Sequence, residues 1–278
     1  MNRPFPIAMI ITLCALPAWA QTPVCEELTG RQRRLAETIL DSEHLYDCCD
    51  NTIRVCLATQ PACSLAERLA DNVCRRVAAG QDEQRIRRAL SRRARSMVGG
   101  GAPAEIDLQS AVVLGPNDAP VTLVIYACAR CPYCSRLIPE LVEAIRDGPL
   151  QENVRLAFRI FPIRGHEGST PAGLAFQTAA DLDVFWPFML YAYGHFDDWT
   201  EEAQVRWATE VGLERNVFET RMADPATRAA LVESKKEGLV NGVEATPTIF
   251  INGRRWVGDL ETVELVDGLE EVVIRTAQ

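Results

Sequence analysis

The hydrophobic pattern at the start of the chain predicts helices and no strands. Apolar residues recur at helical spacing in three segments, 31–45, 64–80 and 82–97. Ser64 followed by Glu67 is typical of a capping box, and Asp82 precedes the third segment in the position of an N-cap. We therefore expect a small all-α region at this end of the chain.

The pattern changes in the second half, where strand and helix signals alternate. Residues 121–126 form an apolar, β-branched run, and apolar residues from 137 to 145 then recur at helical spacing. Further helical patterns, and a second strand signal with a hairpin, follow at 172–182, 201–211, 225–239, 249–251 and 255–257. This part of the sequence predicts an α/β domain.

The first twenty residues have the pattern of an export signal. Arg3 precedes an apolar run from Ile7 to Leu16, and Pro17 and the sequence Ala-Trp-Ala at 18–20 follow. A membrane anchor is the alternative, but it needs about 20 apolar residues and this run supplies about half of that. We expect a signal peptide at 1–20, cleavage after Ala20 and a periplasmic protein.

The ten cysteines are unevenly distributed. One lies in the predicted signal peptide and three lie between 128 and 134; the remaining six are Cys25, Cys48, Cys49, Cys56, Cys63 and Cys74. In an exported protein these six predict up to three structural disulfides, with the pairing left open. The adjacent pair Cys48-Cys49 also suggests a reactive or metal-binding site, but the later spacings do not match the C-x2-4-C pairs of zinc sites.

Charge divides the chain at about the same place as the cysteines. Residues 21–96 contain 13 Arg and 11 acidic residues, whereas 97–278 contain 15 basic and 27 acidic residues. A Gly- and Pro-rich stretch at 99–104 is typical of a linker, so we expect a Cys-rich helical domain at 21–98 and a second domain at 105–278. Six arginines between 85 and 95 fit a solvated helix face, and no nucleic-acid partner is expected.

The second domain contains a C-x-x-C pair between a predicted strand and a predicted helix. Cys131-Pro132-Tyr133-Cys134 follows the strand at 121–126. Free amides and the dipole at a helix N-terminus stabilise a thiolate, which is the reactive form of cysteine. We expect Cys131 to be the exposed nucleophile and Cys134 the buried resolving thiol, with Arg130 as a cation beside them.

Cys128 extends this pair to C-x2-C-x2-C, which is also seen in metal sites. No fourth ligand lies nearby, and the histidines at 44, 166 and 195 lack paired ligand spacing, so no metal is expected. Two interpretations of Cys128 stay open. It is either a small core residue at a strand end or a third redox thiol that competes with Cys134 for Cys131.

A second motif, Gly242-Val243 through Thr246-Pro247-Thr248, precedes the strand at 249–251. Together with Asp118-Ala-Pro-Val and the C-P-Y-C pair, it resembles the DsbA family of exported thiol–disulfide oxidoreductases over residues 105–275. The resemblance implies a thioredoxin-like fold with a helical insertion at about 171–240. It also implies that Pro247 is cis and faces the pair, that Pro132, Tyr133, Thr246 and Pro247 contact the substrate, and that no organic cofactor is needed.

The resemblance predicts an enzyme that exchanges disulfides with cysteines of other exported proteins and is recycled by a redox partner, in the membrane or outside it. DsbA oxidants usually carry His in place of Tyr133, so we expect a less oxidising pair, with oxidase or isomerase activity favoured. Residues 48–97 faintly resemble the helical domain of CcmH-type proteins, without their C-P-x-C pair. This favours, as an alternative, a reductase of cytochrome c maturation. A second alternative is a binding module with the thioredoxin domain as scaffold.

Overall fold

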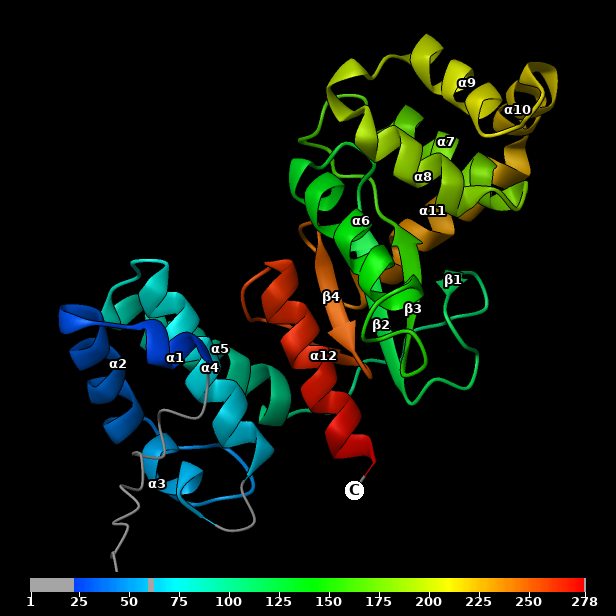
Figure 1. Ribbon diagram of the computed structural model, residues 1–278. Helices are drawn as coiled ribbons and strands as arrows, with labels where there is room; N and C mark the ends of the chain where they lie inside the picture. Colours follow the sequence, from blue (N-terminus) through cyan, green and yellow to red (C-terminus); the bar gives the residue numbers. More distant parts are fainter. Residues whose placement is uncertain (1–22, 60–62, 278) are drawn as a thin grey trace, which may run out of the picture. The chain divides into compact units, whose positions relative to one another are not determined.

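The structure is a computed structural model that describes residues 23–59 and 63–277 (Figure 1). The predicted signal peptide at 1–20 lies outside the described residues. The chain divides into two compact units, Met1–Leu90 and Ser91–Gln278. This division falls inside helix α5 (Glu83–Val98), whereas the composition led us to expect it at 99–104.

The described part of the first unit is helical, as predicted. Its helices are α1 (Pro23–Glu27), α2 (Gly30–Ser42), α3 (Ile53–Leu57), α4 (Ser64–Ala78) and the first half of α5. Helix α2 ends earlier than the predicted 45, because residues 43–45 are extended and pair with 51–53. The predicted cap at Ser64 is wrong, since Cys63 occupies the N-cap of α4; Asp82 does cap α5, accepting from the Arg85 amide at 2.8 Å.

Three disulfides join the elements of the first unit. They are Cys25–Cys74, Cys48–Cys63 and Cys49–Cys56, so the prediction of structural disulfides is confirmed. Cys25, Cys56 and Cys74 lie in an apolar core with residues of all five helices, including Ile39, Ile53, Leu69 and Ile86. Among the described residues no cluster of His, Cys, Asp and Glu has the arrangement of a metal site.

The second unit is built on a five-stranded sheet. Its strands are β1 (Val112–Leu114), β2 (Val121–Ala127), β3 (Val154–Ile160), β4 (Thr248–Ile251) and β5 (Arg254–Arg255). The strand order is β1-β3-β2-β4-β5; β2 and β3 are parallel and the other pairs are antiparallel. Asn252 and Gly253 both have positive φ in the β4–β5 turn, as expected for a two-residue hairpin.

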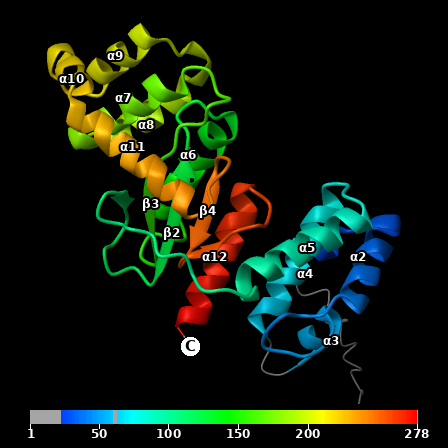
Figure 2. The same cartoon turned by 180° about the vertical axis from the view of Figure 1, so that it is seen from behind.

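Helices cover both faces of this sheet. Helices α6 (Pro132–Arg146) and α12 (Thr262–Thr276) contact each other and the sheet on the face in front in Figure 1. Figure 2 shows the opposite face, where α11 (Pro225–Val240) crosses β3. Because side chains alternate along a strand, Val124 and Tyr126 of β2 face this second side and pack with Phe161 and Phe250.

The remaining helices form the predicted insertion between β3 and β4. They are α7 (Ser169–Asp181), α8 (Phe185–Gly194), the 3₁₀ helix η2 (Phe196–Asp198), α9 (Glu201–Glu210) and α10 (Arg215–Met222). Together with α11 they gather at one end of the sheet (Figure 1). The hydrophobic pattern predicted α7, α9 and α11 but did not indicate β1, β3, α8 or α10.

A buried polar network fixes α11 to the sheet. The Tyr126 hydroxyl donates to both carboxylate oxygens of Glu237 at 2.8 Å, and Asn241 Nδ2 donates to the same carboxylate. Arg159 on β3, whose side chain is 2% exposed, pairs with Glu237 at 3.1 Å. Since α11 leads directly into residues 242–247, this network anchors the chain immediately before the Thr246-Pro247 motif.

The last turns of α5 belong to the second unit. Arg93 is buried there and forms ion pairs with Asp267 and with Glu271 of α12, the latter at 2.9 Å. Arg254 donates to the carbonyl of Gly99 at 2.8 Å. A buried charge is tolerated when it is paired and hydrogen-bonded, and both conditions are met for Arg93.

Candidate redox site

The C-x-x-C pair lies where β2 passes into α6. Strand β2 ends at Ala127, residues 128–130 form a turn, and Cys131 is the N-cap residue of α6 with Pro132 directly after it. The Cys131 amide donates to the Cys128 carbonyl at 3.1 Å, and the Ser135 amide donates to the Cys131 carbonyl at 3.0 Å. The sequence favours this start because proline is well tolerated in the first turn of a helix.

This position makes Cys131 acidic. Hydrogen bonding from the Cys134 thiol is the largest cause, and it lowers the pKa of Cys131 to about 5 against the opposing effect of burial. The backbone amides of Cys134 and Tyr133 contribute in the same direction. At neutral pH the reduced site therefore contains a thiolate at Cys131, the form that attacks a disulfide.

Cys134 has the opposite property. Its side chain is fully buried, and burial followed by interaction with Cys131 raises its pKa well above the ordinary value. The two sulfurs thus divide into one thiolate and one neutral thiol that donates to it. A nucleophile and a resolving thiol need such a division, and the two roles stay a prediction.

The expected exposure of Cys131 is wrong, however. Cys131 is 1% exposed, because its sulfur lies against Thr246 and Cys134 instead of projecting into solvent. The exposed surface at the site comes from its neighbours. Pro132 is exposed, and the Tyr133 side chain, at 63% exposure, is stacked by Arg136 at 5.3 Å from its ring centroid.

The Thr246-Pro247 motif meets the pair in space across 115 residues of sequence. The Cys131 sulfur lies 3.3 Å from the Thr246 carbonyl, which accepts a hydrogen bond from it when Cys131 is protonated. The peptide bond between Thr246 and Pro247 is cis, as the resemblance implies. Thr246 is half-buried and lies against Cys131, and Pro247, which follows it, is buried.

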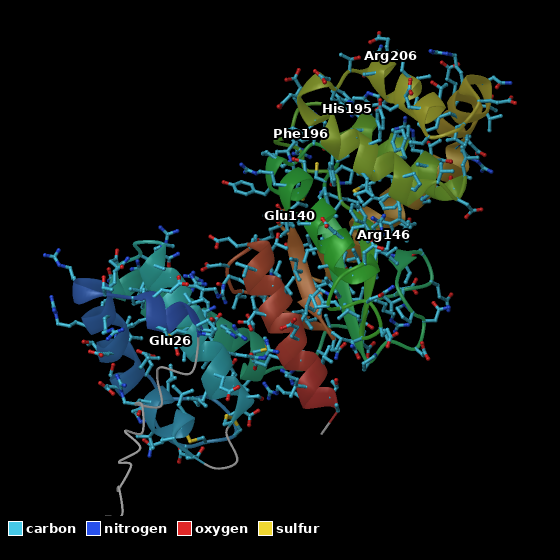
Figure 3. The ribbon with its side chains drawn as sticks, viewed as in Figure 1. Glu26, Glu140, Arg146, His195, Phe196 and Arg206 are labelled. Atoms are coloured by element: carbon cyan, nitrogen blue, oxygen red, sulfur yellow. A yellow bond between two sulfur atoms is a disulfide. The ribbon has the colours of Figure 1, made fainter. Side chains whose placement is uncertain are left out.

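Arg130 does not lie over the thiolate as a free cation. Its Nη1 donates to the Phe196 carbonyl at 2.6 Å, and its guanidinium lies 4.5 Å from the Phe196 ring centroid and 4.9 Å from that of Trp199. Figure 3 shows Phe196 beside the N-terminal end of α6, with Glu140 and Arg146 further along that helix. Arg130 therefore ties the active-site turn to the helical insertion through cation–π contacts.

Sequence reasoning missed His166. Its Nδ1 lies 3.4 Å from the sulfur of Cys128, in the loop that follows β3. Tyr193 of α8 donates from its hydroxyl to the Cys128 carbonyl at 3.2 Å. His166 and Tyr193 lie 38 and 65 positions after Cys128 in the sequence, and no local pattern indicates either contact.

A cavity of about 930 Å³ opens beside the site. The loop 162–171 and one side of α11 form its walls, and Glu244, two residues before Thr246, lies at its edge. Leu239 and Val232 contribute apolar surface there and are 56% and 45% exposed. A more polar pocket of about 540 Å³ is lined by Pro132, Ser135 and Arg136 of α6 and by residues 193–198.

The arrangement of strand, C-x-x-C turn, helix and facing cis-proline agrees with a comparison against family models. The model described as Thioredoxin matches residues 108–271, more than half of the chain. The chain belongs to the thioredoxin family.

Solved structures that resemble this thioredoxin chain have the same architecture. A thioredoxin-like oxidoreductase from Silicibacter pomeroyi DSS-3 is 28% identical, with a TM-score of 0.50 over 59% of this chain and 92% of that one. Oxidised BdbD from Bacillus subtilis is 20% identical, with a TM-score of 0.55 over 62% and 98%. The thiol–disulfide exchange protein α-DsbA2 from Wolbachia pipientis is 19% identical, with a TM-score of 0.53 over 69% and 100%. The predicted DsbA-like thioredoxin fold is confirmed.

The curated relatives carry a different name. Na⁺/H⁺ antiporter NhaA 3 of Salinispora tropica is 32% identical over 179 residues, which is 62% of this chain and 27% of the antiporter. NhaA 1 of Salinispora arenicola is 30% identical over 175 residues, covering 60% and 26%. The chain thus spans about a quarter of the length of these relatives. Within residues 23–59 and 63–277, no helix has the length and apolar character needed to cross a membrane.

Proposed function

We propose that this protein is an exported thiol–disulfide oxidoreductase that acts on cysteines of other exported proteins through Cys131 and Cys134. The observation that carries the proposal is the pairing of an acidic Cys131, with a pKa of about 5, and a buried, neutral Cys134 at the start of α6. Such a pair is suited to disulfide exchange, because the rate depends on the attacking thiolate and on how well the leaving sulfur carries negative charge.

The exchange balances with no cofactor. In the oxidised enzyme, a substrate thiolate attacks the Cys131 sulfur, the Cys131–Cys134 bond breaks, and Cys134 leaves as a thiolate that takes up a proton. A second substrate thiolate then attacks the substrate sulfur of the mixed disulfide. A substrate disulfide forms and Cys131 leaves as the stabilised thiolate. The reverse sequence reduces a substrate disulfide, with Cys134 as the resolving thiol.

The surroundings of Cys131 suggest how a substrate segment is held. Thr246 presents its backbone beside the sulfur, and Pro132 and Tyr133, which follow Cys131 in the chain, are exposed. From Thr246 the chain leads back to Glu244 and the 930 Å³ cavity. A substrate strand that runs along Thr246 would place a side chain near its cysteine against the apolar wall formed by Leu239 and Val232.

Two observations support an oxidising compartment. The first unit has three disulfides, which persist outside the cytoplasm, and the sequence predicts a signal peptide at 1–20. We therefore infer that the protein acts in the periplasm. A separate redox partner, in the membrane or outside it, would have to recycle the pair after each exchange.

The direction of the reaction follows from the reduction potential. The pKa of Cys131, about 5, lies between the thiol pKa values of about 3.5 for DsbA and about 7 for thioredoxin. Stabilising the thiolate stabilises the reduced form and makes the disulfide more oxidising, so we expect a potential between about −120 and −270 mV. A pKa below that of thioredoxin favours a pair more oxidising than thioredoxin's, and therefore an oxidase or isomerase over a reductase of cytochrome c maturation.

The test is the potential of the Cys131–Cys134 pair in residues 21–278, measured by equilibration with glutathione buffers and mass-spectrometric counting of thiols. A value near that of DsbA supports a donor of disulfides, and a value near that of thioredoxin supports a reductase. The Cys131→Ser variant is the control, and it should neither oxidise a reduced protein substrate nor reduce insulin. A folded wild-type protein with no exchange activity would favour a binding module instead.

A further inference from the structure

Cys128 is a buried nucleophilic group that the exchange reaction leaves unused. It is fully buried and, with Cys131 and Cys134, one of three free cysteines of the described chain. Its sulfur accepts a hydrogen bond from the Arg130 amide at 3.4 Å and lies 3.4 Å from His166 Nδ1. Ser169 and the Ile163 amide also hydrogen-bond to it. A small core residue at a strand end would need none of these polar partners.

The turn at 128–131 brings Cys128 close to the nucleophile. The Cys131 amide donates to the Cys128 carbonyl at 3.1 Å, which is the bond that closes a four-residue turn. The end Cα atoms of such a turn lie within about 7 Å of each other. Cα atoms of disulfide-bonded cysteines are usually about 4.4–6.8 Å apart. The backbone thus holds Cys128 and Cys131 at a separation that overlaps the range of a disulfide.

His166 is placed to activate this thiol. Burial raises the pKa of Cys128, so the sulfur carries a proton at neutral pH and needs a base before it can attack. His166 also lines the 930 Å³ cavity, where its ring can exchange a proton with water. A thiol beside an imidazole that reaches solvent is the arrangement of a nucleophile and its base.

The other groups around Cys128 come from its own turn and from three helices. Arg130 lies on its own turn and Lys235 on α11. Burial lowers the pKa of both cations, and attraction to a negative charge on Cys128 opposes that shift. Lys235 is held near by its bond to the Pro162 carbonyl. Tyr193 of α8 donates to the Cys128 carbonyl, and the Cys131 and Cys134 sulfurs of α6 complete the surroundings. Two cations therefore favour a transient Cys128 thiolate.

We propose that Cys128 is a second resolving thiol for Cys131, with His166 as its base, a role that rests on the proposed exchange function. The step begins from the mixed disulfide between Cys131 and a substrate. The Cys128 thiol gives its proton to His166 Nδ1 and its sulfur attacks the Cys131 sulfur. The Cys128–Cys131 bond forms as the bond to the substrate breaks, and the substrate leaves as a thiolate that takes up a proton. The cysteines of the enzyme are oxidised and the substrate sulfur is reduced.

The experiment uses dithionitrobenzoate with the reduced full chain of the Cys134→Ser variant. Attack by Cys131 releases one thionitrobenzoate and leaves a second attached to Cys131. We expect Cys128 to displace the second, so that this variant releases two equivalents and Cys128→Ala/Cys134→Ser releases one. Cys128→Ser/Cys134→Ser repeats the comparison with a side chain of similar size. Release of a single equivalent and a lasting adduct in Cys134→Ser would overturn the proposal.

Tryptic mapping identifies the bond that forms. Trypsin cleaves after Arg130, so a Cys128–Cys131 disulfide joins two peptides, whereas a Cys131–Cys134 disulfide lies within one peptide. The joined pair should appear in Cys134→Ser after the second release. If Cys131 fails to react at all, in the wild type as well, the exchange function itself is wrong; a stable adduct on Cys131 contradicts only the role of Cys128.

The pH profile tests His166. The rate of the second release is measured as a function of pH in the Cys134→Ser background. Adding His166→Asn removes the base and should slow this rate by about tenfold or more. The matched control adds His195→Asn instead, and it should leave the profile unchanged. His195 is the residue directly after α8 (Figure 3). An unchanged profile with His166→Asn would exclude His166 as the base.

Discussion

The reactivity of the site depends on two sulfurs with opposite pKa shifts. Cys131 has a pKa of about 5 because the Cys134 thiol donates to it, and burial keeps Cys134 protonated. We predict that alkylation of Cys131 in the reduced protein is half-maximal near pH 5, rises above it and falls below it, because only the thiolate reacts.

The same argument predicts the effect of removing Cys134. In Cys134→Ala the main stabilising hydrogen bond is lost, so the midpoint of Cys131 alkylation should move to higher pH. The rate of reaction with iodoacetamide, followed by mass spectrometry from pH 4 to 9, measures both midpoints. Equal midpoints in the two proteins would show that the amides at the start of α6 are sufficient for the low pKa.

At this scale the sequence predicted residues that a local motif or the family resemblance identifies. Cys131 and Cys134 share a helical turn, and the resemblance pairs them with Thr246 and Pro247. The contacts of Arg130 with Phe196 and of Cys128 with His166 were not predicted. They join a turn to distant loops, and their formation depends on how the insertion packs against the sheet.

Helix α11 offers a test of how an element positions the site. Glu237 neutralises the buried Arg159 and accepts from Tyr126. We predict that Glu237→Gln lowers the free energy of unfolding by about 3 kcal/mol or more, because it leaves a buried charge without its partner. Glu233→Gln, on the same helix in an exposed pair with Lys236, should change it by less than about 1 kcal/mol. Urea unfolding measures the free energy of unfolding of both variants. Equal decreases in the two variants would show that the network does not stabilise the fold.

The cavity beside α11 predicts a difference between large and small substrates. Leu239 lines the cavity and is 56% exposed, so Leu239→Ser removes apolar contact area without opening the core. We expect a severalfold lower kcat/KM for oxidation of a reduced protein substrate and an unchanged rate with dithiothreitol. Val263→Ser on α12, at 50% exposure and away from the cavity, is the control. An equal loss with dithiothreitol would mean that the substitution disturbs the redox pair itself.

Elements with a regular hydrophobic period were predicted and the others were not. Strand β2, helix α6 and the β4 hairpin follow their patterns, and α7, α9 and α11 follow theirs. Strand β3 carries Arg155 and the buried Arg159, and these charged residues interrupt its hydrophobic pattern. The ion pair with Glu237 that allows Arg159 to be buried cannot be read from the sequence of the strand. Helix α8 is apolar on nearly all sides and contains Pro187, so its sequence has no helical period.

At the scale of the whole molecule, composition indicated two parts but could not pair their cysteines. The six cysteines of the first unit pair as they do because helix docking brings distant positions together, as with α1 and α4 at Cys25 and Cys74. The partner of each cysteine is set by this packing and not by spacing along the chain. The division inside α5 also escaped prediction, since the helix is continuous in its hydrophobic pattern.

The disulfides of the first unit predict separate stabilities for the two units. Cys25–Cys74 closes the longest loop of the three and lies in the apolar core, so Cys25→Ala/Cys74→Ala should destabilise the first unit by about 2–5 kcal/mol. The potential of the Cys131–Cys134 pair should stay the same, because the residues that set the Cys131 pKa all belong to the second unit. Hydrogen exchange measures the first effect in each unit, and glutathione equilibration measures the second. A shifted potential in the double variant would show that the Cys-rich unit tunes the redox pair, and would give that unit a direct part in the exchange reaction.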